Sequence, residues 1–290
     1  MGWLLLCIFC NVALAVIFKG FQRYQIDNLH AIVANYFVCV IVASFVLGKW
    51  AFPMDFMYRP WAVWAVILAL LFISGFNVMA LSFQKSGVAL TAIIQKMSLI
   101  LPASFAIALY GEPLTILKGG GILLALIAVF LVNRPSSKDA PKLSFLDPII
   151  LLPLLTFIMS GIIEIILFYV EAEGLVAEEG IVFTSTCFGL AGIFGAIYTV
   201  IRGFKRNIWP NSKEIVAGMI LGLPNFFSIY LLVLLLSKGW QGSVLFPVNS
   251  ISILIASSIV GFAFYKENAD KYKITGIALG ILAIIMISLS

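Results

Sequence analysis

Charged residues are scarce in this chain. Asp, Glu, Lys and Arg make up 11% of its 290 residues, whereas 62% are hydrophobic and the mean hydropathy is +1.13. Soluble globular proteins contain about 25% charged residues, so this composition argues against one and is typical of a polytopic membrane protein. The longest polar connection runs from Asn133 to Asp147. We therefore expect no separate soluble domain.

Histidine and cysteine are also rare, with one and four residues respectively. His30 has no cysteine or carboxylate at metal-ligand spacing, and Cys7 and Cys10 form a C-x-x-C on an apolar stretch, where cysteine acts as a small packing residue. The sequence has no HExxH motif and no Ser-His-Asp arrangement. We expect no enzyme, no metal site and no cofactor.

The chain instead contains long apolar segments. A membrane-spanning helix needs about 20 mostly apolar residues. Segments of this kind predict an all-α fold with ten membrane helices, the first being a true span rather than a signal peptide: 2–18, 30–48, 61–83, 88–110, 114–132, 148–170, 180–202, 213–236, 243–265 and 273–289.

The ends of the two sequence halves are similar. In residues 86–132 and again in 238–288, a glycine-containing turn precedes a long apolar segment, a glutamate closes it, and a glycine-rich apolar segment follows. The two glutamates are Glu112 and Glu267. We interpret residues 1–133 and 148–290 as two five-helix repeats joined by a polar linker at 134–147. Repeats with an odd number of spans enter the bilayer in opposite directions, as in secondary transporters with a site at the repeat interface.

With Gly111-Glu112 and Lys266-Glu267 each preceding a glycine-rich last helix, the chain resembles the drug/metabolite transporter superfamily, specifically its EamA-type members. The resemblance covers nearly the whole chain. It implies export or exchange of small metabolites, often amino acids or related solutes. It also implies a central cavity lined by the first, third and fourth helices of each half.

Basic residues indicate an orientation. Thirteen of the 18 lysines and arginines fall in the loops after the first, third, fifth, seventh and ninth predicted helices; the opposite loops contain Lys49, Arg59, Lys118 and Lys238. Because cytoplasmic loops retain basic residues, both termini are expected on the non-cytoplasmic side of a cell membrane. The net charge of +5 is accounted for by these loops and gives no reason to invoke nucleic acid.

Two ionisable residues fall inside predicted helices. Lys96 lies near the centre of the 88–110 segment and Glu164 within 148–170. A charge at mid-membrane costs about 2.5–3.5 kcal/mol on the lenient insertion scale, so each needs a cavity or a partner. Lys96 either binds an anionic solute group or has a structural role. Glu164 is a candidate for coupling to a proton or cation, and whether the two side chains pair is left open.

Uncharged polar residues extend this candidate cavity. At 100° per residue, Thr91, Gln95, Ser98 and Pro102 share one face of their helix, and a similar stripe follows 243–257 with Ser243, Pro247, Ser250 and Ser257. Serine and threonine also permit close helix packing in lipid, so each stripe has two interpretations. Buried amides are expected to line the cavity, namely Gln95, Asn11, Asn77, Asn225 and Asn249.

Prolines inside helices are hinge candidates. Pro102, Pro224 and Pro247 fall within predicted spans, where a proline frees a carbonyl group and kinks the axis. In contrast, Gly119-Gly120-Gly121 lacks the context of a phosphate loop and is expected to let its helix pack closely.

These observations predict a secondary transporter of a small polar solute, anionic or zwitterionic, that works by alternating access around Gln95, Lys96 and Glu164. A lipid-linked sugar flippase or sugar-phosphate exchanger of the same fold is the alternative, although it would favour more cavity cations than Lys96. A non-transporting receptor or assembly protein is the third hypothesis. The solute, the coupling ion and the oligomeric state are left open.

Overall fold

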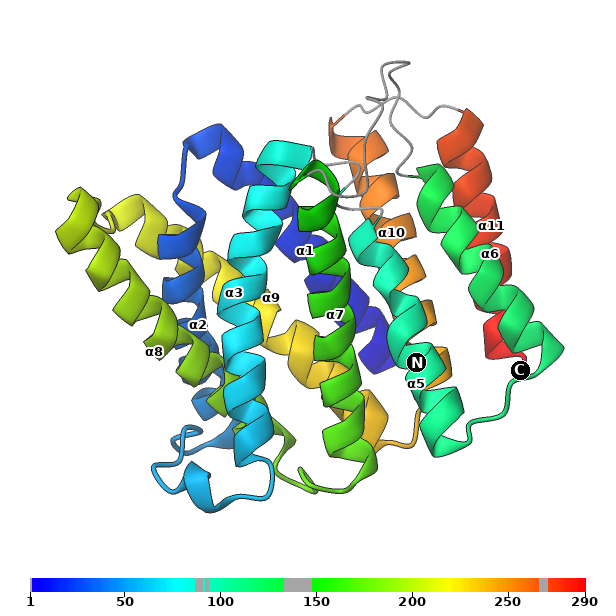
Figure 1. Ribbon diagram of the computed structural model, residues 1–290, viewed down its shortest axis with the longest axis horizontal. Helices are drawn as coiled ribbons and strands as arrows, with labels where there is room; N and C mark the ends of the chain where they lie inside the picture. Colours follow the sequence, from blue (N-terminus) through cyan, green and yellow to red (C-terminus); the bar gives the residue numbers. More distant parts are fainter. Residues whose placement is uncertain (1, 87–90, 92–93, 133–147, 266–270) are drawn as a thin grey trace. The chain divides into compact units, whose positions relative to one another are not determined.

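The computed structural model describes residues 2–86, 91, 94–132, 148–265 and 271–290 (Figure 1). The predicted linker at 134–147 and Glu267 lie outside these residues. Every regular element in the described ranges is helical. The elements are α1 Gly2–Tyr24, α2 Asn28–Leu47, η1 Phe56–Tyr58, α3 Ala62–Ser86, η2 Met97–Leu99, α5 Ile100–Tyr110, α6 Ile116–Val132, α7 Pro148–Ala172, α8 Gly180–Arg206, α9 Ser212–Ser237, α10 Gly242–Tyr265 and α11 Lys271–Ser288.

Seven helices within the described ranges are long and apolar enough to cross a membrane: α2, α3, α7, α8, α9, α10 and α11. Shorter apolar helical stretches cover Gly2–Phe18, Ile94–Tyr110 and Ile116–Val132. A helix bonds its own backbone internally, which is what a segment in hydrocarbon requires. The chain is therefore an all-helical polytopic membrane protein.

The helices form two compact units. Unit 1 comprises Met1–Asn77 and Tyr169–Lys238, and unit 2 comprises Val78–Phe168 and Gly239–Ser290. Each unit thus takes helices from both halves of the sequence, so the contact units do not coincide with the predicted repeats at 1–133 and 148–290. The boundaries fall within α3, near the end of α7 and just after α9.

Unit 1 is built on α2, which packs against α8 and α9, while α1 packs against α9. Glycine permits the closest approach. A Cβ atom at Gly218 of α9 would lie 2.6 Å from the Cβ of Ala34 and would also clash with the Ala31 carbonyl oxygen. One turn later, Gly222 is equally close to Val38. Small residues let the two backbones approach each other, as is common between membrane helices.

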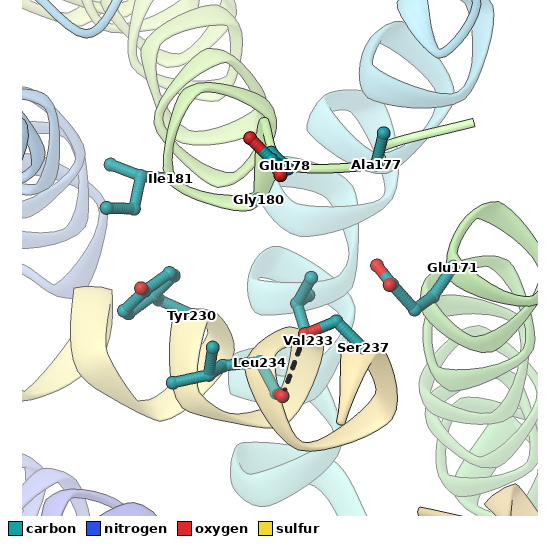
Figure 2. Close-up of a pocket in the computed structure, with 9 residues that line it drawn as sticks. All are labelled: Glu171, Ala177, Glu178, Gly180, Ile181, Tyr230, Val233, Leu234 and Ser237. Carbon is teal, nitrogen blue, oxygen red and sulfur yellow. Dashed lines mark hydrogen bonds between the residues drawn. The ribbon is translucent and has the colours of Figure 1, made fainter. Parts of the chain in front are cut away.

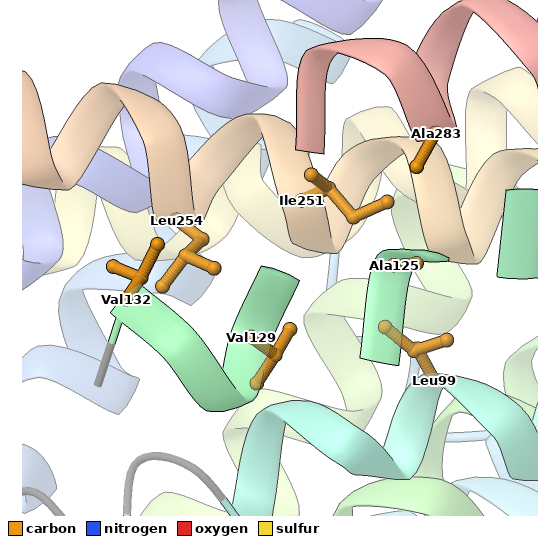
Figure 3. Close-up of a cluster of buried hydrophobic side chains, with 7 residues drawn as sticks. All are labelled: Leu99, Ala125, Val129, Val132, Ile251, Leu254 and Ala283. Carbon is orange, nitrogen blue, oxygen red and sulfur yellow. The ribbon is translucent and has the colours of Figure 1, made fainter. Parts of the chain in front are cut away.

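Unit 2 is built on two helix pairs, α6 with α11 and α5 with α10. Its buried apolar cluster combines these elements with η2 and consists of Leu99, Ala125, Val129, Val132, Ile251, Leu254 and Ala283 (Figure 3). A Cβ atom at Gly121 would lie 2.6 Å from the side chain of Ile287 on α11. Gly121, and to a smaller extent Gly120 at 3.0 Å from Met286, therefore permit close packing of α6 on α11, whereas a Cβ atom at Gly119 would make an ordinary contact.

Gly111 ends α5 as the sequence predicts. It has a left-handed conformation with φ 66°, and its N–H donates to the Ala106 carbonyl. Glycine adopts this conformation without the strain that a side chain imposes. The next residue, Glu112, reaches the start of α10, where its carboxylate accepts hydrogen bonds from the N–H groups of Gly242 at 2.8 Å and Ser243 at 2.9 Å. Glu112, which follows the end of α5, therefore caps the start of α10.

One predicted helix is interrupted. Instead of a regular helix over 88–110, the short 3-10 turn η2 separates the helical residues 94–96 from α5. Because Pro102 has no N–H group, it cannot donate to the carbonyl of Ser98 four residues earlier. The backbone adopts the narrower 3-10 geometry at this point. Pro102 occupies the first turn of α5 and lies within the helical stretch Ile94–Tyr110. Pro224 and Pro247 lie inside α9 and α10.

Candidate functional site

The candidate site in unit 2 begins at the interruption before α5. Gln95 and Lys96 are the last α-helical residues before η2, and Lys96 is the N-cap residue of that turn. A stretch of 3-10 geometry within a longer helix often marks a functional hinge.

Glu164 of α7 belongs to the same unit. Its charge and that of Lys96 interact electrostatically, without a direct ion pair between the two side chains. The Glu164 Oε2 atom is buried and has no hydrogen-bond partner within the described part of the chain. Leaving a buried carboxylate oxygen unsatisfied is costly. This atom is therefore available to a proton, a cation or a donor group of a solute.

Gln95 connects the interruption to α7. Its Nε2 group donates a hydrogen bond of 3.4 Å to the hydroxyl of Ser160. Ser160 and Glu164 are four residues apart in α7 and thus share one helix face. The structure accordingly brings Gln95, Lys96 and Glu164 together, with Ser160 as an addition that the sequence did not single out.

The other residues of the polar stripe predicted around Gln95, namely Thr91, Ser98 and Pro102, are buried in the protein. Thr91 and Ser98 are buried, and the Thr91 hydroxyl is 2.7 Å from the hydroxyl of Ser82. Such a short bond between two segments of unit 2 fits the packing role considered for these residues. Pro102 is buried in the first turn of α5.

The second stripe, on α10, is also buried. Pro247, Asn249 and Ser250 are inaccessible to solvent or nearly so, and Ser257 is partly buried. The Oδ1 atom of Asn249 has no hydrogen-bond partner among the residues that the structure describes. A buried amide oxygen normally accepts a hydrogen bond, so Asn249 is the α10 residue best placed to meet a solute or a water molecule.

Ser243, at the start of the α10 stripe, belongs to a structural network. It donates to the Glu112 carboxylate and accepts a 2.9 Å bond from the ammonium of Lys118, which also donates to Gln241 at 2.8 Å. Lys118 is fully buried in α6. The sequence interpretation of Lys118 as a loop cation is therefore wrong: Lys118 lies in α6, and the polar groups at the start of α10 satisfy its buried ammonium.

The other predicted amides, Asn11, Asn77 and Asn225, belong to unit 1, whereas Lys96 and Glu164 belong to unit 2. Asn11 donates to the Cys7 carbonyl of its own helix at 2.9 Å, and Asn77 donates to that of Ile73 at 2.8 Å. Asn225 donates to the side chain of Asn35 at 3.2 Å. Pro224 precedes this buried amide pair, which joins α9 to α2.

A cluster of charged residues in unit 1 was not predicted as a group. His30 Nδ1 is 2.8 Å from Glu214 Oε2, and the Arg202 guanidinium donates two hydrogen bonds, of 3.1 and 2.7 Å, to the Asp27 carboxylate. Burial by itself raises the pKa of Asp27, but the hydrogen bonds and charge of Arg202 outweigh it and hold that pKa below its ordinary value. The four residues come from two distant parts of the sequence, 27–30 and 202–214, so no local motif indicates the cluster.

The cysteines lie inside the protein, which fits the packing role expected for them. All four cysteines are buried and free; Cys39 donates to the Gly222 carbonyl at 3.4 Å, and Cys7 donates to that of Ser228 at the same distance. The described residues contain no group of three or more His, Cys, Asp or Glu side chains that could hold a metal ion.

A cavity of about 440 Å³ in unit 1 involves residues that the sequence analysis did not select. Two glutamates line it, Glu171 in the last turn of α7 and Glu178 in the connection to α8 (Figure 2). Residues 171–179 contain four of the 13 acidic residues of the chain. This local concentration was a readable signal, but its position near a helix end made it look like an ordinary solvated loop.

Comparisons with known proteins support the fold and do not assign a function. The chain matches no protein-family model. An uncharacterized protein of Haemophilus influenzae is 26% identical over 287 residues, which cover 97% of this chain and 95% of that protein. A protein of known crystal structure aligns with a TM-score of 0.77 at 15% identity, covering 99% of this chain and 95% of its own. At that identity the likeness shows a shared fold alone.

Proposed function

We propose that the protein is a secondary transporter of a small polar solute that carries an anionic group, and that it belongs to the EamA-type drug/metabolite transporters. The observation that carries this proposal is that Gln95 and Lys96 lie at a helix interruption, with Gln95 bonded to Ser160 one turn before Glu164 in α7. An ionisable group inside a membrane protein marks a solute or ion path by default.

Each side chain has a distinct task in this proposal. The Lys96 ammonium holds the carboxylate or other anionic group of the solute, and the Gln95 amide hydrogen-bonds its polar body. The unsatisfied Oε2 of Glu164 takes up a coupling proton or cation, or accepts from the ammonium of a zwitterionic solute. Solute binding then biases the two access states by its different affinity for each.

A ten-span arrangement of two inverted repeats is part of the proposal. In each unit, helices at equivalent positions of the two sequence halves pack on one another: α2 with α8, α5 with α10, and α6 with α11. Elements related by a two-fold axis in the membrane plane contact one another when they lie near that axis. These three pairings support the repeat interpretation without relying on sequence similarity.

Both termini are proposed to face away from the cytoplasm. Thirteen of the 18 basic residues fall in the loops then assigned to the cytoplasm, and Lys118 is removed from the opposing set because it is buried in α6. An alkaline phosphatase domain fused after Ser290 should be active in a bacterial host. A cytoplasmic reporter fused at the same position should be inactive, and the reverse pattern would contradict the orientation.

The function is tested first by thermal stabilisation of the purified protein with L-glutamate, L-alanine, L-lysine, glycerol 3-phosphate and glucose. Lys96→Met and Glu164→Gln are compared with Lys213→Met, whose side chain is exposed at the start of α9. An anionic or zwitterionic solute should stabilise the parent and Lys213→Met but not Lys96→Met. The same solute, labelled, should then exchange across liposomes that contain the parent protein.

Other outcomes separate the alternatives. Stabilisation by glycerol 3-phosphate alone would favour a sugar-phosphate exchanger. Solute binding without any exchange by the parent would favour a receptor. If no solute stabilises the parent and both charge variants only unfold more readily, Lys96 and Glu164 are structural and the proposed site is wrong.

A further inference from the structure

The cavity in unit 1 lies where the connection between α7 and α8 meets the last turns of α9 (Figure 2). Its volume of about 440 Å³ falls within the range of about 300–1,000 Å³ that is usual for small-molecule pockets. The residues that matter for its chemistry are Glu171, Glu178, Ile181, Tyr230, Val233 and Ser237. None of them belongs to the proposed Lys96 site.

The cavity is lined by two carboxylates. Glu171 extends its carboxylate from the end of α7 toward the hollow (Figure 2), and its Oε2 atom is buried without a hydrogen-bond partner among the described residues. Glu178 contributes the second carboxylate, whereas the neighbouring Glu179 is occupied by Arg59 at 2.6 Å and by the indole N–H of Trp61 at 3.0 Å. No lysine or arginine is among the described lining residues.

The wall opposite Glu171 is aromatic and apolar. Tyr230 stacks on Phe226 of the same helix, with ring centroids 5.5 Å apart and planes at 9°, so its ring is held in place. Val233 and Ile181 add hydrocarbon surface. The Ser237 hydroxyl donates to the Leu234 carbonyl at 2.9 Å, which leaves its oxygen free to accept. Aromatic faces and carboxylates both attract cations, whereas hydrocarbon favours the organic part of one.

We propose that this cavity binds an organic ammonium ion, a small primary amine or diamine, with its charged nitrogen between Glu171 and Glu178 and its carbon chain against Tyr230 and Val233. A bare divalent cation fits less well. Calcium takes six to eight oxygen ligands at about 2.3–2.6 Å, which two carboxylates and a hydroxyl in so large a cavity do not provide. The proposal does not depend on transport at the Lys96 site.

An internal cation is the competing occupant. Lys238 follows Ser237 at the end of α9, and its side chain is exposed. If the Lys238 ammonium folds into the cavity, it occupies the position assigned to the ligand. Replacing it by methionine would then uncover the site, so Lys238→Met distinguishes a ligand pocket from a self-satisfied ion pair.

The test is binding of putrescine to the purified full-length protein at 0.15 M salt, by isothermal titration and thermal shift, with 1,4-butanediol as the uncharged analogue. Glu171→Gln should weaken binding about 10- to 100-fold, as expected for loss of a charge-assisted hydrogen bond. Tyr230→Leu should weaken it about 3- to 10-fold through the lost cation–π contact. Glu173→Gln changes the same charge in the same connection without lining the cavity and should bind like the parent.

Several results would overturn the proposal. Equal binding of 1,4-butanediol and putrescine would show that charge is not recognised. If Mg²⁺ or Ca²⁺ stabilises the protein at the same concentrations as putrescine, the two carboxylates bind a metal ion instead. Putrescine binding that survives in Glu171→Gln would place the amine elsewhere, and failure to bind both the parent and Lys238→Met would exclude an ammonium pocket. Lys96→Met should bind putrescine normally, so loss of the transport hypothesis leaves this one intact.

Discussion

His30 and Glu214 are 184 residues apart in the sequence, yet the imidazole Nδ1 lies 2.8 Å from the Glu214 carboxylate. Their side chains are 0% and 8% exposed. The same carboxylate accepts from the backbone and side chain of Asn211, closing a capping box at the start of α9. One acidic residue therefore both begins α9 and attaches it to the first turn of α2.

Glu214→Ala should destabilise the protein by about 2–4 kcal/mol, because it removes a helix cap and leaves a buried imidazole donor unsatisfied. Glu214→Gln, which keeps an acceptor oxygen, should cost less. Both losses are measured as the change in the free energy of unfolding by SDS in mixed micelles, relative to the parent protein. Lys213→Ala is the control, since that neighbouring side chain is exposed; an equal loss in the control would contradict the specific role of the pair.

The Asp27–Arg202 pair predicts a stability change in acid. The pKa of Asp27 lies below its ordinary value of 3.8, so the native state favours the ionised carboxylate. Its contribution is complete above that ordinary value and is lost as the pH falls through the lowered native pKa. The parent should unfold at a higher temperature than Asp27→Asn at pH 7, and this difference should shrink below about pH 4. A difference that stays constant down to pH 3 would be inconsistent with the pairing.

Glu112→Ala should destabilise unit 2 by about 1–2 kcal/mol, the usual cost of losing an N-cap. The residue accepts from the first two N–H groups of α10 and from the Ser243 hydroxyl. Thermal unfolding of the variant is compared with that of Glu178→Ala, where an exposed glutamate is removed. If both variants unfold at the same temperature as the parent, the cap contributes nothing.

Two glycines predict changes of opposite sign. Gly218→Ala puts a methyl group 2.6 Å from Ala34 and should destabilise unit 1 by about 1–3 kcal/mol through overpacking. Gly20→Ala in α1 meets no atom within 4 Å and should stabilise its helix by about 0.5–1 kcal/mol. Their SDS unfolding curves should shift in opposite directions. A gain from Gly218→Ala would show that α2 and α9 are less tightly packed than described.

Hydropathy located the helical segments well where apolar runs have clear ends. The predicted segment 213–236 corresponds to α9 Ser212–Ser237, whose boundaries are set by Asn211 and by the turn after Ser237. It underestimated α1, which continues to Tyr24, because Lys19 and Arg23 lower the hydropathy of turns that remain helical. It also missed η2, since a 3-10 turn has the same composition as the helix around it.

The candidate site was predicted from its residue types, without the contacts that connect its members. Lys96 and Glu164 could be selected because a charge in an apolar segment is visible in the sequence. The contact between Gln95 and Ser160 that links them could not be predicted. A serine in an apolar helix is common, and the two residues are 65 positions apart in the sequence. Lys118 shows the opposite error. Its place at the edge of an apolar run indicated a loop, whereas Gln241 and Ser243 make its burial possible.

Because each compact unit combines helices from both halves of the sequence, its packing partners are synthesised at different times. α2 ends at Leu47 but its main partner, α9, begins at Ser212, so at about 5–20 residues per second roughly 10 to 30 seconds separate their synthesis. During that interval the asparagine and cysteine face of α2 is in the membrane without its partner. The hydrogen bond between Asn225 and Asn35, which joins α9 to α2, can therefore form only after the second half of the chain has been made.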